Sequence, residues 1–329
     1  MGSVRPVKLL VLGGTKFLGR ATVEAALAGG HDVTLFNRGQ TNPDLFPEAE
    51  KLLGDRTQDL SPLEGRQWDA VVDPSGYVPA TVRASAEALR DSVGHYLFVS
   101  SISAYATFSA ASTEEDPTKE IGDLPQDRLL EDYSNYGPLK ALCEQAVREV
   151  YGERATIVRP GLVVGPHDPT GRFTYWPHRI ARGGDVLLPA PADEKVQFID
   201  VRDLSGWIVG LCERRQGGTF NATGPGVTWT ELAETCRDVA GSDAEFVWVD
   251  GDFLAEHEVE EWMGLPMWIH DPEWLGMHLT DVSKAFADGL TERPLPETVR
   301  GALEQAGTTE EAGITRERES EILAAWKAR

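Results

Sequence analysis

The chain has 329 residues, which is enough for one large α/β domain and a smaller second domain. Its formal net charge of −22 argues against nucleic acid or an anionic membrane as the main partner, because either would be repelled. No unbroken apolar run reaches the roughly 18 residues of a membrane span, and residues 1–8 lack the apolar core of a signal peptide, so we expect a cytoplasmic protein without a membrane partner.

Residues 7–36 follow the pattern of a mononucleotide-binding unit, with an apolar strand, a helix and a second strand in turn. A glycine loop joins the first strand to the helix. We expect Gly13 to make the tight turn and Gly19 to let helix and strand pack closely, so that the first helical amides face a pyrophosphate. The loop residues predicted to bind a dinucleotide are Gly13, Gly14, Thr15, Lys16, Phe17, Leu18 and Gly19.

Asn37 and Arg38 follow the second strand, where NAD enzymes usually carry a carboxylate for the adenosine ribose. A guanidinium suits a 2′-phosphate and Lys16 adds a cation nearby, so we expect NADP or NAD as cofactor, with NADP favoured. Both cations could instead be solvated surface charges, or Arg38 could stack on adenine without selecting NADP. Asp55, after the third predicted strand, is placed to meet the adenine edge, with a turn carboxylate as the alternative.

Strands predicted at 68–72 and 95–99, with a helix between them, continue the α/β alternation. Ser101 follows the fifth strand, and hydroxyls at the carboxyl end of a parallel strand project into the crevice where ligands bind. Tyr136 and Lys140 open a later helix, and their spacing of four residues places them side by side on one helical face.

This arrangement of hydroxyls and an ammonium suits hydride transfer. A phenol has a reference pKa near 10, so it is a poor base at neutral pH. The charge of Lys140, together with oxidised nicotinamide, would favour the phenolate of Tyr136, which could then take the proton of a secondary alcohol as hydride leaves its carbon. Ser101 would hydrogen-bond the same oxygen, and Lys140 would also bind the nicotinamide ribose.

These residues together resemble the extended short-chain dehydrogenase/reductase family, also called the NAD-dependent epimerase/dehydratase family. The resemblance covers residues 7–223 with motifs, and it implies that Ser101, Tyr136 and Lys140 are the catalytic triad. The glycine loop departs from the family pattern because Lys16 replaces its middle glycine. This variant resembles an atypical branch that includes bacterial epimerase-like proteins and plastid RNA-associated proteins, some of them described as RNA-binding.

The resemblance implies an α/β fold: a Rossmann-type doubly wound parallel sheet with a smaller α/β substrate-binding C-terminal domain. We expect the cofactor domain at residues 1–160, with 196–223 returning to it. Residues 161–195 and 224–329 would then form the substrate-binding domain and the tail. At strand ends beside the cofactor we expect Ser100, Arg159 and Pro160. Family members commonly dimerise, so a homodimer is possible.

Several positions bear on the substrate. Leu162 stands where the family's nucleotide-sugar enzymes carry an asparagine, and Val196 where they carry an arginine for the diphosphate, which weakens the UDP-sugar interpretation. Ile102 and Ser103 replace the acidic pair of the dehydratases and argue against 4,6-dehydration. The residues expected to contact substrate are Ser103, Tyr77, Leu162, Arg172, Tyr175, Trp176 and Gln197.

The aromatic residues near Trp176, and an aromatic stretch from Trp262 to Leu275, could line a pocket or pack the core of the small domain. The cysteines Cys143, Cys212 and Cys236 are far apart in sequence and lack metal-ligand spacing, so we expect buried thiols and no metal site.

The leading hypothesis is an NAD(P)-dependent oxidoreductase or epimerase that acts on a secondary alcohol or ketone of a polyhydroxylated small molecule, such as a sugar, a nucleoside or a sugar-bearing metabolite. A close alternative is an NADPH-dependent ketone reductase of a natural-product pathway. A different class is a non-catalytic dinucleotide-binding or RNA-associated scaffold.

Overall fold

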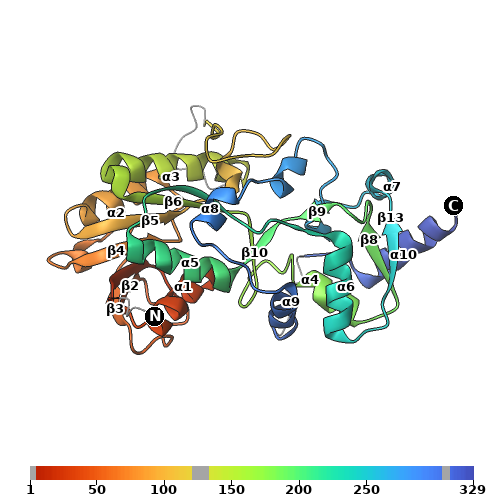
Figure 1. Cartoon of the computed structure of the whole chain (residues 1–329), viewed down its shortest axis with the longest axis horizontal. Helices are drawn as coiled ribbons and strands as arrows, with labels where there is room; N and C mark the ends of the chain where they lie inside the picture. Colours follow the sequence, from red (N-terminus) through yellow and green to blue (C-terminus); the bar gives the residue numbers. More distant parts are fainter. Residues whose placement is uncertain (1–4, 121–132, 306–311) are drawn as a thin grey trace.

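The computed structural model describes residues 5–120, 133–305 and 312–329 (Figure 1). Its larger part is a seven-stranded sheet in the order β11-β6-β5-β4-β1-β2-β3, with every neighbouring pair parallel. The chain runs outward from β1 in one direction and from β4 in the other, so the order switches between these two strands. In such sheets the crevice at the carboxyl ends of the two central strands is the usual ligand site. The strands of the sheet are β1 (Lys8–Leu12), β2 (Asp32–Asn37), β3 (Glu50–Leu53), β4 (Trp68–Asp73), β5 (Val93–Val99), β6 (Ala155–Pro160) and β11 (Gly218–Ala222).

Helices cover both faces of this sheet (Figure 1). The helices are α1 (Phe17–Ala28) and α5 (Val201–Arg214) on one face, and α2 (Pro79–Leu89) and α3 (Tyr136–Tyr151) on the other. The alternation of side chains along β1 explains the two cores: Leu9 and Val11 pack towards α1 and α5, while Leu10 and Leu12 pack in the other core. Both cores are apolar because each strand is buried on its two faces.

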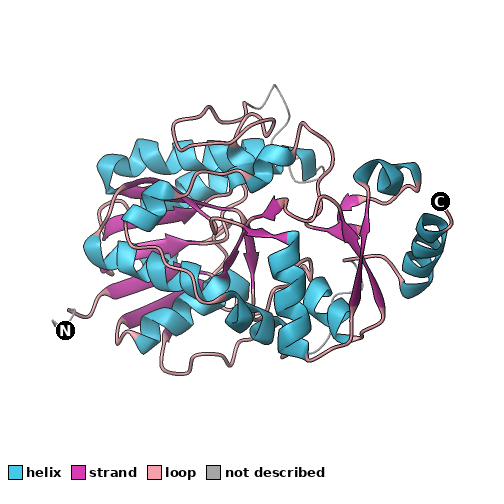
Figure 2. Ribbon diagram, turned by 45° about the vertical axis from the view of Figure 1, so that its right-hand side comes forward, coloured by secondary structure: helices cyan, strands magenta, loops and turns pink. Residues whose placement is uncertain are grey.

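A smaller α/β part follows the sixth strand, and Figure 2 shows its strands and helices beside the large sheet. It is built around the parallel pair β8 (Asp185–Pro189) and β13 (Glu245–Val249), and its core contains the buried indoles of Trp176, Trp229 and Trp268. Its other short strands are β7 (Leu162–Val164), β9 (Lys195–Val196), β10 (Phe198–Asp200), β12 (Val227–Thr228), β14 (Glu261–Trp262) and β15 (Leu265–Pro266). Its helices are α4 (Tyr175–Ala181), α6 (Trp229–Ala240), α7 (Gly251–Glu256), α9 (Leu295–Leu303) and α10 (Arg316–Lys327).

We call the large sheet with its helices the sheet half, and the part around β8 and β13 the small half. The predicted α/β fold class, a parallel Rossmann-type sheet with a smaller C-terminal part, is confirmed. Residues 199–222 pack with the sheet half, while Val196 and Phe198 pack in the small half. Helix α8 (Ser283–Ala287) also returns to the sheet half, through Ala285 and Leu290, which the sequence did not indicate.

Short 3-10 turns complete the described elements: η1 (Ser61–Leu63), η2 (Ile102–Ala104), η4 (Tyr133–Asn135), η5 (Gly152–Arg154) and η6 (Leu275–His278), the last between β15 and α8. None of the helices within the described ranges combines the length and apolarity that crossing a bilayer requires.

Candidate active site

The glycine loop after β1 has a backbone that other residues would strain. Gly13 and Gly14 have φ values of +115° and +91°, in the region that favours glycine. A Cβ on Gly14 would lie 2.7 Å from Leu35 Cδ2, and one on Gly19 would lie 3.1 Å from the Gly14 nitrogen. The loop is therefore both left-handed and closely packed, which places the start of α1 directly against the end of β1.

Amide side chains hold this loop in position. Asn37 Nδ2 donates to the Gly13 carbonyl at 2.9 Å, and Asn42 Nδ2 donates to the Thr15 carbonyl at 2.9 Å. Asn37 Oδ1 accepts from the Gly39 amide at 2.8 Å, so both ends of its side-chain amide bind the backbone. Its side chain therefore supports the loop that is predicted to bind the cofactor, and a contact of Asn37 itself with the cofactor stays a prediction.

The start of α1 suits an anionic group. No side chain caps the helix at Lys16, and its first turn carries no acidic residue. Its amides and the positive end of its dipole are thus open to a phosphate. A Cβ built on Gly13 would meet only Ser75 Oγ, at 3.6 Å, so a ligand can approach the backbone here. Thr15 and Leu18 are buried and Lys16 is exposed. These features match a dinucleotide pyrophosphate.

At the adenosine end, Arg38 is exposed next to the last residue of β2. Asp55 Oδ1 accepts hydrogen bonds from the hydroxyl and amide of Thr57, at 2.7 and 2.9 Å. These bonds, the hydroxyl first, hold the pKa of Asp55 below its usual value, with a small contribution from Arg38. Asp55 is therefore a turn carboxylate, as the sequence allowed, and its contact with adenine stays a prediction.

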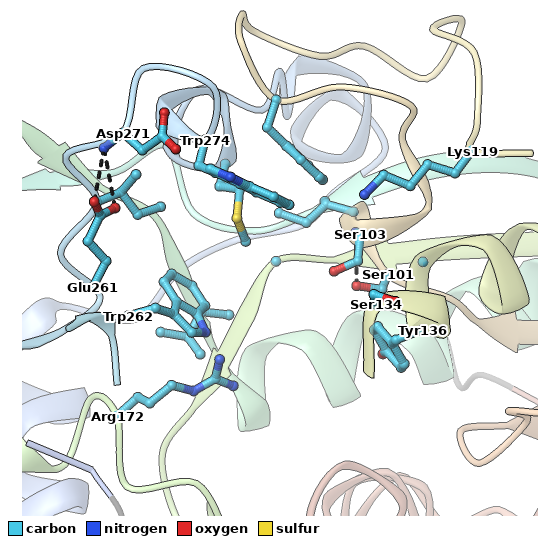
Figure 3. Close-up of a pocket in the computed structure, with 17 residues that line it drawn as sticks. Ser101, Ser103, Lys119, Ser134, Tyr136, Arg172, Glu261, Trp262, Asp271 and Trp274 are labelled. Atoms are coloured by element: carbon cyan, nitrogen blue, oxygen red, sulfur yellow. Dashed lines mark hydrogen bonds between the residues drawn. The ribbon is translucent and has the colours of Figure 1, made fainter. Parts of the chain in front are cut away.

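Ser101, Ser103 and Tyr136 line one end of a single pocket of about 540 Å³ (Figure 3). Ser101 and Ser103 come from the η2 turn after β5, where Ser101 Oγ accepts from the Ser103 amide at 3.1 Å. Tyr136 is the first residue of α3. The turn and the helix thus bring two hydroxyls and a phenol, predicted from residues far apart in sequence, to the same end of the pocket.

Lys140 lies behind Tyr136, one helical turn along α3, and is only 2% exposed. Its Nζ donates to the carbonyls of Gly76 and Val99, at 2.8 and 2.7 Å, and lies 4.4 Å from the centre of the Phe98 ring. Burial lowers the pKa of Lys140 to about 8. The lysine thus ties the end of β5 to the loop after β4, and its charge is held by two backbone carbonyls away from solvent.

Tyr77, predicted to contact substrate, lies next to this pair rather than in the pocket lining. Its ring centre is 6.4 Å from that of Tyr136 and 5.3 Å from Lys140 Nζ. The side chain is 48% exposed. Tyr77 therefore lies at the surface next to Tyr136 and Lys140, where it can cover a group bound against them.

The side chains of Ser100 and Arg159 bind Glu144 in this structure, and their contacts with the cofactor stay predictions. Ser100 Oγ donates to Glu144 Oε1 at 2.6 Å, and Arg159 donates to both oxygens of Glu144, at 2.8 and 2.7 Å. Glu144 lies one turn beyond Lys140 on α3 and is 3% exposed. Both side chains are thus used by a buried ion-pair network, while Pro160, buried at the end of β6, stays a predicted cofactor contact.

Two distant segments form the pocket walls. The sheet half supplies Phe108 and Lys119, and the small half supplies Arg172, Trp262 and Trp274. The rings of Phe108 and Trp274 stack with centres 5.5 Å apart, which joins the two segments. Of the predicted substrate contacts, Ser103, Leu162 and Arg172 line this pocket.

Tyr175, Trp176 and Gln197, also predicted to contact substrate, do not line this pocket, because their side chains pack elsewhere. Trp176 is fully buried in the small half and its Nε1 donates to the Pro266 carbonyl at 2.9 Å, while Tyr175 packs edge-on against it. Gln197 is 5% exposed and exchanges two hydrogen bonds with the backbone of Thr280. These side chains therefore belong to the packed interior and do not line the pocket.

The pocket also contains residues that were not singled out as substrate contacts. The aromatic stretch noted in the sequence supplies Trp262, Ile269 and Trp274, so its interpretation as a pocket lining holds for part of it. Phe108 and Lys119 lie in an irregular segment without a motif, and their only sequence signal was their position soon after Ser101 and Ser103.

Comparisons with known proteins identify a family and a shared fold. The model of the NAD dependent epimerase/dehydratase family matches residues 9–223. A chloroplast stem-loop binding protein of 41 kDa (form b) from Arabidopsis thaliana is 25% identical over 265 residues, covering 71% of this chain. The chain spans only 63% of that relative's length.

Among solved structures, a UDP-N-acetylglucosamine 4-epimerase from Bacillus cereus is 20% identical with a TM-score of 0.66, covering 92% of this chain and 100% of its own. The Bordetella bronchiseptica enzyme WbmH, solved in complex with NAD⁺, is 17% identical with a TM-score of 0.66, covering 91% and 97%. At these identities the likeness shows a shared fold. On the strength of the family match, which spans the glycine loop, the η2 turn that follows Ser101 and α3, the chain belongs to the NAD-dependent epimerase/dehydratase family.

Proposed function

We propose that the protein is an NAD(P)-dependent oxidoreductase or epimerase that acts on a secondary alcohol or ketone of a polyhydroxylated small molecule. The observation that supports this most strongly is the meeting of Ser101 and Tyr136 at one end of a pocket, with the Lys140 ammonium buried behind them. The open helix terminus at the glycine loop supports a dinucleotide as cofactor.

A nicotinamide dinucleotide, when bound along the glycine loop, would supply the hydride acceptor or donor for this reaction. Tyr136 takes the hydroxyl proton of the alcohol while the hydrogen on the same carbon leaves with both bonding electrons, so the alcohol becomes a ketone by loss of one proton and one hydride. Ser101 donates a hydrogen bond to the reacting oxygen and keeps it in line with the phenol. For the reverse reaction the same phenol returns the proton to the ketone oxygen.

Lys140 supports the phenol through its charge. With a pKa of about 8, the group stays mostly protonated at neutral pH. Its surroundings include the Phe98 ring and exclude water, so its field at Tyr136 is screened less than that of a surface lysine. A buried ammonium one turn away therefore stabilises a phenolate, as the proposed base needs.

We further propose that NADP is the preferred cofactor. Arg38 and Lys16 are both exposed and lie at the ends of β2 and the glycine loop, where a 2′-phosphate would lie. A charge-assisted hydrogen bond contributes about 1.5–3 kcal/mol, so Arg38→Ala should weaken NADPH binding by roughly tenfold or more and leave NADH binding nearly unchanged. Fluorescence titration with both nucleotides measures this, with Arg182→Ala as the control, because Arg182 is also exposed but lies in the small half.

The catalytic assignment is tested with Tyr136→Phe and Lys140→Ala. Turnover would be followed by nicotinamide absorbance with a panel of sugars, nucleosides and ketones, and folding by circular dichroism. We expect both variants to stay folded and to lose at least about a hundredfold in rate, the usual contribution of a positioned acid–base group. Full turnover in both variants would show that these residues are not the catalytic pair.

Whether the purified protein retains a dinucleotide distinguishes epimerisation from net reduction. An epimerase takes up its own hydride again, so it should retain NAD(P)⁺ through purification, whereas a reductase must exchange its cofactor each turnover. Release of dinucleotide on denaturation would favour epimerisation. A protein that is empty but binds NADPH would favour net reduction.

One relative is named for stem-loop binding, so an RNA-associated role is the second proposal. The net charge of −22 weighs against it, because RNA would be repelled. An electrophoretic mobility shift with a stem-loop RNA at low salt tests it. Tight binding there would favour the RNA role.

A further inference from the structure

We propose that the pocket binds a hydroxy or keto acid whose carboxylate lies close to the reacting carbon, and that Lys119 binds this carboxylate. The inference deepens the proposed function and rests on it, because it takes the end of the pocket at Ser101 and Tyr136 as the reacting end.

The backbone fixes Lys119 next to the catalytic turn. Its amide donates to the Ala104 carbonyl at 2.7 Å, and the preceding residues form an isolated bridge between Tyr105 and Thr118. A Cβ built on Gly137 would lie 3.5 Å from Lys119 Cδ. The stem of the lysine thus runs past the start of α3, and Lys119 lines the pocket together with Ser101 and Tyr136 (Figure 3).

The ammonium of Lys119 lies against apolar rings. Its Nζ is 5.6 Å from the centre of the Phe108 ring and 5.3 Å from that of Trp274. The ion pairs formed by the described residues involve other cations, so no carboxylate of that part of the chain neutralises Lys119. Ring faces attract a cation, but they replace only a part of the water that it loses.

The two carboxylates in the pocket lining already have backbone partners. The Glu261 carboxylate accepts from the amides of His270 and Asp271, at 2.9 and 3.2 Å, as the dashed lines in Figure 3 show for Asp271. Asp271 Oδ1 accepts from the Glu273 amide at 2.9 Å. Both carboxylates therefore stabilise the turn that carries them, and among the described lining residues none pairs with the Lys119 ammonium, which is available to a ligand.

Charge explains why such a cation would be useful here. The chain has a net charge of −22, so an anionic substrate gains nothing from the surface as a whole and needs a local positive group. At the pocket, Lys119 provides that group at the reacting end, and Arg172 lies on the other side of the pocket over the Trp262 ring at 5.0 Å. The indole rings of Trp262 and Trp274 give the body of the ligand flat apolar surfaces.

The test measures binding of matched acids and amides to the protein loaded with NADP⁺. The probes are mandelate with mandelamide and galactonate with galactonamide, each at millimolar concentration, observed by saturation-transfer NMR and tryptophan fluorescence. We expect each acid to bind roughly tenfold or more tightly than its amide, the usual strength of a hydrogen bond to a charged group.

Variants identify the residue responsible. Lys119→Gln should remove the preference for the acid, and Lys119→Arg should restore most of it. Lys284→Gln is the matched control, because Lys284 Nζ also lies over an aromatic ring, Phe220 at 5.1 Å, but outside the pocket. It should keep the full preference for the acid.

The proposal is overturned if neither acid binds the wild-type protein, if acids and amides bind equally, or if Lys119→Gln keeps the preference. These outcomes concern substrate charge alone. A failure of the proposed function would instead appear as absent NADP⁺ binding or as full turnover in Tyr136→Phe, so the two failures can be told apart.

Discussion

Behind the carboxyl edge of the large sheet, the sheet half buries charged groups, whereas the small half buries mainly indole rings. In the sheet half, Arg56 donates to both oxygens of Asp73 at 2.8 Å, and the Tyr96 hydroxyl donates to the same carboxylate at 2.9 Å. Burial alone would raise the pKa of Asp73, but Arg56 holds it below the usual value. Asp73 ends β4, three residues before the carbonyl of Gly76 that binds Lys140.

The small half also buries an ion pair, since Arg179 Nε donates to Glu319 at 2.6 Å and the Leu187 amide donates to the same carboxylate at 3.0 Å, but its largest buried side chains are indoles. Trp176 and Trp229 pack edge-on with centres 4.9 Å apart, surrounded by aliphatic side chains. The difference matches the division of labour that we propose. Hydride transfer needs a few polar groups held rigidly, which buried ion pairs provide, whereas substrate choice depends on the shape of apolar walls supported by a packed core.

The largest expected effect is a loss of stability in the small half that leaves the cofactor site of the sheet half unchanged. Trp176→Ala should lower the free energy of unfolding by about 3–5 kcal/mol, because it leaves a cavity in the small half. NADPH affinity should change little, since the glycine loop packs in the sheet half. Urea unfolding and fluorescence titration measure both quantities.

The matched control for Trp176→Ala is Trp274→Ala, which removes an indole that is 43% exposed. It should lower the free energy of unfolding far less, by no more than about 1 kcal/mol, and should affect only the binding of ligands in the pocket. If Trp176→Ala abolished NADPH binding while the protein stayed folded, the two halves would depend on each other more than their separate cores indicate.

A second prediction concerns the sheet half alone. Gly14→Ala combines a φ of +91° with a Cβ only 2.7 Å from Leu35, so we expect a loss of about 1–3 kcal/mol in stability and a large loss in NADPH affinity. Gly30→Ala is the control, because its φ is +77° but no atom lies within 4 Å of the new Cβ. Equal NADPH affinity in the two variants would mean that close packing of the loop is unimportant.

The smallest expected effect is a pH dependence caused by Lys140. Burial lowers its pKa from 10.5 to about 8, so between these values the unfolded chain binds more protons than the folded protein. Stability from this group therefore rises as pH rises through this window, by less than about 1.4 kcal/mol per pH unit.

Chemical unfolding at pH 8 and pH 9 tests this sign when wild type is compared with Lys140→Met, which cancels the titration of other groups. Relative to the variant, the wild type should gain stability at the higher pH. Turnover should fall over the same range, because the neutral amine no longer supports the Tyr136 phenolate. A relative loss of wild-type stability would mean that Lys140 is not desolvated.

Much of the sheet half could be predicted because its signals are local. The strand, glycine loop and helix of residues 7–36 lie next to one another, and the spacing of Tyr136 and Lys140 sets their common helical face. Ser100 shows the limit of a motif. It lies next to Ser101 in extended chain, so alternation sends the two hydroxyls to opposite faces, and only one of them can face the pocket.

The small half was harder to predict because its contacts join distant residues. The partner of Trp176 is the carbonyl of Pro266, 90 residues later, and Gln197 binds Thr280, 83 residues later. Nothing near either residue in sequence indicates these partners. The aromatic composition alone was therefore compatible with two interpretations, a pocket lining and a packed core. The structure assigns Trp176 to the core and Trp274 to the pocket.

The seam between the two pocket walls has a consequence for evolution. The amide of Gly276 donates to the Phe108 carbonyl and that of Asp281 to the Ser112 carbonyl, while the Phe108 ring stacks on Trp274. A smaller ring at Phe108 or Trp274 alone would leave a gap in the pocket wall, and a larger ring would cause a steric clash. Substitutions at positions 108 and 274 should therefore be accepted as pairs, so a lineage that acquires a new substrate would record it as correlated changes at two sites more than 150 residues apart.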